Sequence, residues 1–508
     1  MAPILKLRAP HFRVALQHFS PPLSRRRWLE RLGTLGVPAG LIGCAGTGLE
    51  RVATSSDPTR IWINRLTWGT SAATARDWDR QGLRDALAQQ LHPDTTTPLP
   101  AAVQARLDGL TRLQAPPADR VIEAEQRRRD GPREDYQRLL DDCAREAATR
   151  TLLLALHSPH QLREQMTWFW FNHFNVAQSK ANLRLLVGDH EQGLRRHALG
   201  RFADLLIAAT THAAMLRYLD NEHNAVGRLN ENHARELLEL HTLGVDGGYG
   251  QRDVQELARL LTGLGVDMNP PPDRAGAGPG DGLTVFRPGR HDAGDKTVLG
   301  RVVRGQRGER GWDEILAQLQ ALARHPSTAR HVCRKLAVYL VADAPPAALV
   351  ERLAARFLAT DGDIAQTLAA LVDAPAFTAS LGQKFKDPLH WIVSAARLAG
   401  DSAAEPLVDV APLLSALGRL GQPLFGRTTP DGYPLDEAAW AGPGQLATRF
   451  ELARSLARLG VAAGQPVPRF DPAALPPLSA QTREVLAQTR SPLEHNALLL
   501  SSPDFMRR

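Results

Sequence analysis

The fold class is indicated most clearly by residues 136–157, which read YQRLLDDCAREAATRTLLLALH. Apolar residues recur here at steps of three and four, the spacing that gathers them on one face of an α-helix. The best strand signals, LTVF and KTVLGRVV, predict one small β-hairpin near residues 283–304. The sequence therefore predicts a mainly α fold, a large multi-helix globular domain. The helical spacing recurs at residues 84–91, 199–219, 253–261, 312–325, 329–343 and 349–358.

The charge of the chain is concentrated at one end. The 508 residues have a net charge of +7, with 43% hydrophobic and 23% charged residues, a composition typical of a folded protein. Residues 1–43 hold seven basic side chains and one acidic side chain, which leaves 54 basic and 53 acidic residues in the remainder. A balanced remainder lacks the basic surface that binds a phosphate backbone, so we expect no nucleic-acid partner.

The basic N-terminal segment, residues 1–43, has its features arranged as in an export signal. Residues 24–30, SRRRWLE, precede an apolar stretch at 32–43 that has the length of a signal core and is too short to span a bilayer. This order resembles a twin-arginine export signal with Arg25 and Arg26 as its arginine pair. The tetrapeptide LIGC resembles a lipobox, in which Cys44 would carry a lipid and hold the protein at a membrane surface. The alternatives are a solvated basic arm and a cysteine that merely lies near the cleavage site.

We expect three parts along the chain. Residues 1–43 form the signal and lipobox segment, residues 44–60 a short tether, and residues 61–508 a single large α-helical domain. A stretch rich in Pro and Gly at 264–282 is either a loop of that domain or the division between two lobes. No transmembrane helix is expected.

Residues 230–244, NENHARELLELHTLG, place many polar side chains on a leucine-rich helix. Because leucines lie on both of its sides, this helix has no clean solvent face, and its carboxylates are expected to be enclosed and to need partners. In one interpretation Arg235 pairs with Glu231 or Glu239, four residues away, in a structural ion-pair lattice. In the other, Glu236 and Glu239 divide acid and base roles or hold a divalent metal ion.

A second polar element lies in an aromatic helix at residues 158–177, SPHQLREQMTWFWFNHFNVA. Ser158 and Pro159 predict the start of the helix. Aromatic side chains cover every face, so we expect the helix to be buried all round. Asn172 and His173 then lie in an aromatic environment and need partners. His173 is either a hydrogen-bonded core histidine or a ligand or acid–base group.

Two further polar clusters lie in the second half of the chain, HDAGDK at 291–296 and RHPSTARHVCRKL at 324–336. The first suits a tight turn and the second suits the first turn of a helix, so each has a local explanation. If both converge on the aromatic helix and on residues 230–244, their side chains are numerous enough for an active site. These side chains are His291, Asp292, Lys296, His325, Arg330 and Lys335.

The ordered motifs of the chain resemble one bacterial family. In chain order they are WFWFNHF, HALGRFADLL, AMLRYLDN, NENHARELLELHTLGVDGGYGQRDVQELARLLTG, HDAGDKTVLG, HPSTARHVCRKLA, DGDIAQTLAALVDAPAF, KFKDPLHWIVSAAR and GQPLF. Together they are similar to the family called domain of unknown function 1800 (DUF1800), from about residue 63 to the C-terminal LLLSSPDFMRR. The resemblance implies an exported protein of that family's fold whose activity is unassigned. It also implies a neighbour, because members are often encoded beside a second exported family that resembles sulfatases.

The resemblance marks a set of polar positions in this chain. Four departures accompany it. His233 stands where the family usually has Tyr or Phe, Gly250 where Ser or Thr often caps the next helix, and Leu264 where Trp is common. PDGY at 430–433 replaces a Gly-Trp element. The matching positions are Asn172, His173, Asn230, Glu231, Asn232, Arg235, Glu236, Glu239, His241, His291, Asp292, Lys296, His325, Arg330 and Lys335.

Two functions are expected from the sequence. The first is an exported protein, anchored by lipid if Cys44 is modified, that works at the cell envelope with a partner such as the co-encoded sulfatase-like protein. Its polar motifs would hold a large buried network. The second is a periplasmic hydrolase, either metal-assisted or based on carboxylates and histidine, with Glu236, Glu239, His173 and His291 as candidate catalytic residues. A divalent metal ion is the cofactor that this second function allows.

Overall fold

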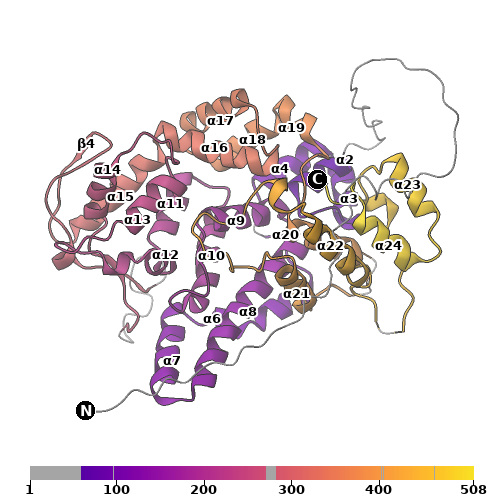
Figure 1. Ribbon diagram of the computed structural model, residues 1–508, viewed down its shortest axis with the longest axis horizontal. Helices are drawn as coiled ribbons and strands as arrows, with labels where there is room; N and C mark the ends of the chain where they lie inside the picture. Colours follow the sequence, from indigo (N-terminus) through magenta and orange to yellow (C-terminus); the bar gives the residue numbers. More distant parts are fainter. Residues whose placement is uncertain (1–58, 95, 271–281, 402, 404, 463) are drawn as a thin grey trace, which may run out of the picture. The chain divides into compact units, whose positions relative to one another are not determined.

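The computed structural model describes residues 59–508, apart from 95, 271–281, 402, 404 and 463 (Figure 1). Arg25, Arg26 and Cys44, the residues expected to direct export and lipidation, lie outside the described residues. The first described helix, α2 (Thr59–Leu66), begins within the last residues of the expected tether. The described residues belong to one unit.

Helices dominate the described chain, which confirms the prediction of a mainly α fold. None of these helices is both long and apolar enough to cross a membrane. After α2 come α3 (Ala72–Gln81), α4 (Leu83–Leu91), α5 (Ala101–Asp108), α6 (Thr111–Gln114), α7 (Pro117–Asp130), α8 (Arg133–His157), α9 (Gln161–His173), α10 (Val187–His197), α11 (Phe202–Thr210), α12 (Ala213–Tyr218), α13 (Asn232–Glu236) and α14 (Gln251–Leu260). The second half contains α15 (Arg310–Ala323), α16 (Pro326–Leu340), α17 (Ala347–Ala359), α18 (Ile364–Val372), α19 (Pro375–Ser380), α20 (Pro388–Gly400), α21 (Ala411–Arg419), α22 (Pro443–Leu456), α23 (Ala480–Ala487) and α24 (Pro492–Ser501). Short 3₁₀-helices lie at Leu183–Leu185, Asn221–His223, Pro288–Arg290, Glu437–Ala439 and Pro472–Ala474.

Helix α8 shows how the apolar spacing specifies a buried face. Leu139, Leu140 and Cys143 are fully buried, whereas Asp141 and Arg145 in the same turns are exposed. The buried face packs against α7 and α10. Burying each large aliphatic side chain contributes about 1.5–3 kcal/mol relative to leaving it exposed, so this face holds the helix in place.

Helix α9 is enclosed on all sides, as its aromatic sequence predicts. Every residue of the helix except Arg163 is buried. It packs against α2, α4, α8 and α10, near the middle of Figure 1. The predicted start at Ser158 and Pro159 is wrong, because the helix begins at Gln161 and the Ser158 hydroxyl instead accepts the His160 N–H at 3.2 Å in the preceding turn.

The strands pair differently from the single hairpin that the sequence suggests. Strand β2 (Thr284–Phe286) pairs antiparallel with β1 (Leu264–Val266), which lies at the start of the stretch rich in Pro and Gly. Strand β3 (Lys296–Val298) pairs antiparallel with β4 (Arg301–Val303). The segment KTVLGRVV therefore folds back on itself, because Leu299 and Gly300 both have positive φ, the backbone that a two-residue hairpin turn requires.

Helix α16 is held against the core by the last residues of the chain. Arg508 Nη2 donates to Tyr339 O at 2.9 Å, and Arg508 Nη1 lies 2.7 Å from His390 Nε2 of α20. The backbone N–H of Arg508 donates to Lys384 O at 2.8 Å. The Tyr339 ring lies 5.1 Å from the Phe169 ring of α9, measured between centroids. These contacts pack α16 against α9, where the polar residues described next are found.

Candidate functional site

The polar segment 230–244 is not one regular α-helix. It contains α13 (Asn232–Glu236) followed directly by a π-helix, η3 (Leu237–His241). The π-helix ends at Thr242, whose hydroxyl donates to Leu237 O at 2.6 Å. Because π-helices are rare and occur frequently at functional sites, this turn is a candidate site.

Two histidines from other helices satisfy the end of the π-helix. His173 Nε2 of α9 lies 3.1 Å from His241 O, and His331 Nε2 of α16 lies 3.0 Å from Leu240 O. Because a carbonyl oxygen only accepts, each Nε2 carries a proton. The last carbonyls of a helix have no partner within the helix, so these two bonds satisfy groups that would otherwise be unpaired. His173 Nδ1 is left with its lone pair and has no hydrogen-bond partner among the described residues.

Burial keeps these imidazoles neutral. It lowers the pKa of His173 and His241 well below the ordinary value, and the charge of Lys335 acts in the same direction. Burial also lowers the pKa of His331 to about 4. The His173 ring centroid lies 6.0 Å from that of His241 and 6.1 Å from that of His331. At neutral pH this cluster therefore supplies uncharged donors and acceptors.

Lys335 lies one helical turn beyond His331 on α16 and is half-buried. Its ammonium group has no hydrogen-bond or ion-pair partner in the part of the chain that the structure describes. Burial lowers the pKa of Lys335 to about 8, and the carboxylate of Asp431 offsets part of this shift. Such an amine can supply a positive charge or exchange a proton near neutral pH.

Glu236 and Glu239 are half-buried carboxylates without partners. Neither accepts a hydrogen bond nor joins an ion pair within the described ranges. Burial raises the pKa of Glu236, and the charges of Glu239 and Asp431 raise it further. A carboxyl group with a raised pKa beside a second carboxylate is an arrangement that divides acid and base roles.

The expected ion-pair lattice forms only in part. Arg235 Nη2 donates to Glu231 Oε2 at 2.9 Å, four residues away. The amide of Asn232 donates to a backbone carbonyl at 3.2 Å. Over the described residues, neither an Arg235–Glu239 ion pair nor an Asn232–Glu236 hydrogen bond is present. Glu236 and Glu239, the two carboxylates on which the enzyme hypothesis depends, are therefore not part of the ion pairs that do form.

Asparagine side chains build the start of this segment. Asn230 Oδ1 accepts the N–H of Asn232 at 3.0 Å, and Asn224 Oδ1 accepts the N–H of Asn230 at 3.0 Å. Asn224 in turn donates to Ala258 O of α14 at 2.8 Å. Asn230 and Asn232 therefore have structural roles, since they fix where α13 begins.

Asp431 comes to the site on a loop at residues 425–433 that Asn172 holds in place. Asn172 Nδ2 donates to Tyr433 O at 2.8 Å, and Tyr433 N donates to Asn172 Oδ1 at 2.6 Å. Gly432 has a φ of +77°, and a Cβ at this position would lie 2.1 Å from Asn172 O. Only glycine allows this approach, so Asn172 acts by positioning the loop that carries Asp431.

Tyr218 of α12 connects the loop to the π-helix segment. Its hydroxyl donates to Thr428 O at 2.7 Å. Burial raises the pKa of Tyr218 to about 12, and the charges of Asp431 and Glu236 contribute to this shift. Because both carboxylates act on one phenol, the loop and α13 face a shared polar region.

Three residues of this polar region were not predicted from the sequence: His331, Asp431 and Tyr218. His331 lies in the motif HPSTARHVCRKLA, four residues before Lys335, and that spacing alone places both side chains on one helix face. Asp431 lies in the PDGY turn, where an aspartate has an ordinary structural explanation. Nothing in the sequence indicates that this turn packs against α9.

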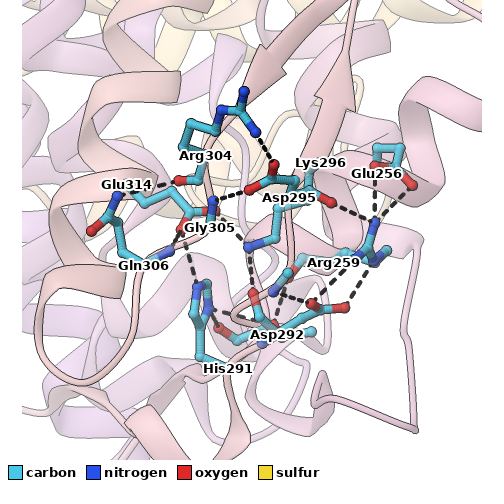
Figure 2. A network of polar contacts seen from close by, with 12 residues as sticks. Glu256, Arg259, His291, Asp292, Asp295, Lys296, Arg304, Gly305, Gln306 and Glu314 are labelled. Atoms are coloured by element: carbon cyan, nitrogen blue, oxygen red, sulfur yellow. Dashed lines mark hydrogen bonds and ion pairs between the residues drawn. The ribbon is translucent and has the colours of Figure 1, made fainter.

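His291, Asp292 and Lys296 lie in a different network, shown in Figure 2. Lys296 Nζ donates to Glu314 Oε1 at 2.6 Å, and both side chains are almost completely buried. His291 Nε2 lies 3.6 Å from Glu314 Oε2, and His291 Nδ1 lies 2.8 Å from Thr262 O. Within the described residues, no hydrogen bond, ion pair or ring contact joins His291 to residues 230–241.

The charged side chains of the same network that lie on α14 and next to His291 are also paired with one another. Arg259 of α14 binds both oxygens of Asp292, at 2.8 and 3.2 Å, and donates to Glu256 at 3.0 Å. Glu256 Oε2 accepts the N–H of Thr297 in β3 at 2.8 Å. The network therefore attaches the β3–β4 hairpin to α14 and α15, which gives Asp292 and Lys296 structural roles.

His325 and Arg330 have local roles on α16. His325 is the N-cap residue, and its Nδ1 accepts the N–H of Ser327 at 3.2 Å. Arg330 is exposed and pairs with Glu351 of α17 at 3.2 Å. Of the residues expected to converge on the polar helix, the structure brings His173 and Lys335 together with it, whereas His291, Asp292, Lys296, His325 and Arg330 make contacts elsewhere.

The described residues contain no group of three or more His, Cys, Asp or Glu side chains that could hold a metal ion. The polar region around the π-helix, which we call the π-helix site, consists of neutral imidazoles, carboxyl groups and one amine. The side chains that define it are His173, Glu236, Glu239, His241, His331, Lys335 and Asp431.

Comparison with known proteins places the chain in a family. Comparison with curated proteins gave no match, and comparison with solved structures gave none either. The family described as "Protein of unknown function (DUF1800)" matches residues 61–507, which include every residue of the π-helix site. The match covers nearly the whole chain, so this protein belongs to the DUF1800 family.

Proposed function

We propose that this protein is an exported hydrolase whose active site is the π-helix site. The observation that carries the proposal is that Glu236, Glu239 and Lys335 are half-buried charged groups without partners within the described chain. Partly burying an unpaired charge costs free energy, and such groups cluster at functional sites. The pair formed by Glu314 and Lys296 shows how a fully buried carboxylate and a fully buried ammonium of the same chain compensate each other.

The pKa shifts of Glu236 and Lys335, together with the position of Glu239 on the same segment as Glu236, suggest separate roles for the three groups. Glu236, with its raised pKa, holds a proton more readily than an ordinary glutamate and is suited to protonate a leaving group. Glu239 is suited to accept the proton of the attacking water, so that the bond to the leaving group breaks as the bond to water forms. Lys335, with a pKa of about 8, is mainly charged at pH 7 and is suited to stabilise negative charge in the transition state.

The test of this proposal compares hydrolysis by the wild-type protein with hydrolysis by Glu236→Gln. The substrates are model esters, amides, glycosides, phosphate esters and sulfate esters. We expect one class to be hydrolysed, at a rate that falls about 10²–10⁴-fold in Glu236→Gln, because the amide cannot donate the proton. Glu231→Gln is the matched control, since Glu231 lies on the same segment and pairs with Arg235. No hydrolysis of any class, or equal rates in both variants, would refute the proposal.

We place this activity outside the cytoplasm on the basis of the sequence. Replacing both Arg25 and Arg26 with Lys keeps the charge and should trap the precursor in the cytoplasm, because a twin-arginine signal requires the arginine pair. Cell fractionation measures the result, with Lys6→Arg as a control outside the pair. Unaltered export of the double variant would contradict this assignment.

Attachment and partnership are further parts of the proposal. If Cys44 carries a lipid, the wild-type protein should appear in the membrane fraction and Cys44→Ser should not. A sulfatase-like protein encoded beside this one is the partner that the family resemblance suggests, and co-purification of the two proteins from the same cells tests it. Recovery of each protein without the other would remove the partner from the proposal.

A further inference from the structure

The loop at residues 425–433 begins with a strained residue. Phe425 has a φ of +60°, although its bulky side chain is fully buried. Such a residue in the left-handed region costs free energy and persists only where its surroundings fix it. Its ring lies 4.8 Å from the Phe171 ring of α9, measured between centroids, and its carbonyl accepts the Gln178 N–H at 3.0 Å. Because strained residues cluster at functional sites, the fixed conformation of this loop is a candidate functional feature.

The side chain of Asn175, just beyond the end of α9, fixes the middle of the loop. Its Nδ2 donates to Arg427 O at 3.0 Å and to Thr429 O at 2.8 Å. An amide NH₂ group carries two hydrogens, so these two bonds use both of them. Asn175 is only 2% exposed, which shields both bonds from competition with water.

The two residues whose carbonyls Asn175 binds are the same two whose side chains hold the Asp431 carboxylate. Arg427 Nη2 donates to both Asp431 oxygens, at 3.1 and 3.0 Å, and the Thr429 hydroxyl donates to Asp431 Oδ1. The Asp431 side chain is 54% exposed, so packing does not fix it. Its position therefore depends on Arg427 and Thr429 and, through their backbone, on Asn175.

Asp431 acts on two other groups of the π-helix site. Burial is the largest cause of the raised pKa of Glu236, and the charge of Asp431 adds to it. Burial lowers the pKa of Lys335 to about 8, and the charge of Asp431 offsets part of this shift. Both effects favour the protonated form, and both weaken as the distance from the carboxylate grows. The charge of Asp431 serves these groups only if the carboxylate is held near them.

We infer that Asn175 is a positioning residue of the π-helix site and that it fixes the Asp431 carboxylate. It acts through Arg427 and Thr429, the two residues that contact this carboxylate, whereas Asn172 holds the far end of the same loop. The benefit to catalysis rests on the proposed hydrolysis, but the positioning itself is measurable without a substrate.

The test compares Asn175→Ala with the wild type by the pH dependence of Lys335 acetylation in the full-length protein. Without the two bonds the carboxylate is no longer fixed near Lys335, so the midpoint should move to lower pH, as in Asp431→Asn. The double variant Asn175→Ala/Asp431→Asn should shift no further than Asp431→Asn alone, because residues that act through one another are not additive. Hydrolysis of the accepted substrate class should fall about 10–10²-fold in Asn175→Ala.

Asn496→Ala is the matched control. Asn496 is also fully buried, donates to Pro468 O at 2.8 Å and accepts the Phe470 N–H at 3.1 Å. It therefore holds a different loop with the same chemistry. This variant should lose stability but leave the Lys335 midpoint unchanged.

A second variant keeps the test decisive if Asn175→Ala does not fold. Thr429 is exposed, and Thr429→Val keeps the shape of the side chain while removing the hydroxyl that binds Asp431. The Lys335 midpoint should again move to lower pH. Shifted midpoints without hydrolysis of any substrate class would support the positioning role and refute the proposed hydrolase. An unchanged midpoint in either variant, or an equal shift in Asn496→Ala, would overturn the inference.

Discussion

Replacing Glu314 with Gln is expected to lower the free energy of unfolding by about 3–5 kcal/mol. Glu314 is the carboxylate that neutralises Lys296, at 2.6 Å, and the two side chains are 1% and 0% exposed. The variant keeps the shape of the side chain but leaves the buried ammonium without its ion-pair partner, which is the costly way to break such a pair. Chemical denaturation measures the change.

The control for this prediction is Glu351→Gln. Glu351 also pairs with a basic side chain, Arg330 at 3.2 Å, but both side chains are more than half exposed. An exposed pair contributes about 0–1 kcal/mol, so this variant should unfold almost as the wild type does. Replacing Lys296 and Glu314 together with Met should recover part of the loss. Equal effects of Glu314→Gln and Glu351→Gln would show that the network in Figure 2 is not structural.

The pair formed by Glu314 and Lys296 also makes the free energy of unfolding depend on pH. Burial alone raises the pKa of Glu314, but contacts with His291, Lys296 and the Gln306 N–H lower it below the ordinary value. The unfolded chain has a glutamate pKa of about 4.3, so the contribution to stability is complete above that pH. It is lost as the pH falls through the lower pKa of the folded state. Glu314→Gln should therefore lose less stability than the wild type over this acidic range.

Lys335 is expected to react with acetic anhydride far faster than an ordinary lysine at pH 7. An amine with a pKa of about 8 is roughly 10% unprotonated at pH 7, against about 0.04% for an ordinary lysine, a ratio on the order of 10². Trace acetylation followed by peptide mass spectrometry measures the reaction at each pH. The rate should rise with a midpoint near pH 8, and a midpoint near 10 would contradict the account of its surroundings.

Two comparisons identify the cause of this reactivity. Lys180 lies near the surface beside Asp220, at 2.9 Å, and provides an internal reference in the same digest. Asp431→Asn should move the Lys335 midpoint to lower pH, because the Asp431 carboxylate raises the pKa of Lys335. An unchanged midpoint in Asp431→Asn would show that the loop at 425–433 does not act on this amine.

The helices could be predicted because their cause is local. Apolar spacing at 136–157 specifies the buried face of α8, and the aromatic residues of α9 specify its complete burial. The π-helix at Leu237–His241 could not be predicted, because α- and π-turns differ in backbone bonding while the residue pattern is the same. The strand pairing was missed because LTVF has its partner at Leu264–Val266, inside a segment that resembles a loop.

The candidate site was only partly predictable for a similar reason. Glu236, Glu239, His173 and Lys335 are polar residues in apolar helical patterns, and such a mismatch is visible in the sequence. The role of Asp431 could not be predicted from the sequence. Its position depends on the hydrogen bonds between Asn172 and Tyr433, which lie 261 residues apart in the chain. The polar residues of HDAGDK looked equally suited to catalysis, but their partners, Glu314 and Arg259, lie on helices that the sequence does not assign to them.

The central claim is that the charges of the π-helix site serve a substrate and not the fold. Thermal unfolding of Glu236→Gln, measured beside the wild type and Glu314→Gln, tests this claim most directly. Removing an unpaired, half-buried carboxylate breaks no bond and relieves a cost of burial, so the account predicts a melting temperature equal to or above that of the wild type. A fall comparable to that of Glu314→Gln would show that Glu236 belongs to a structural network, and it would contradict the account.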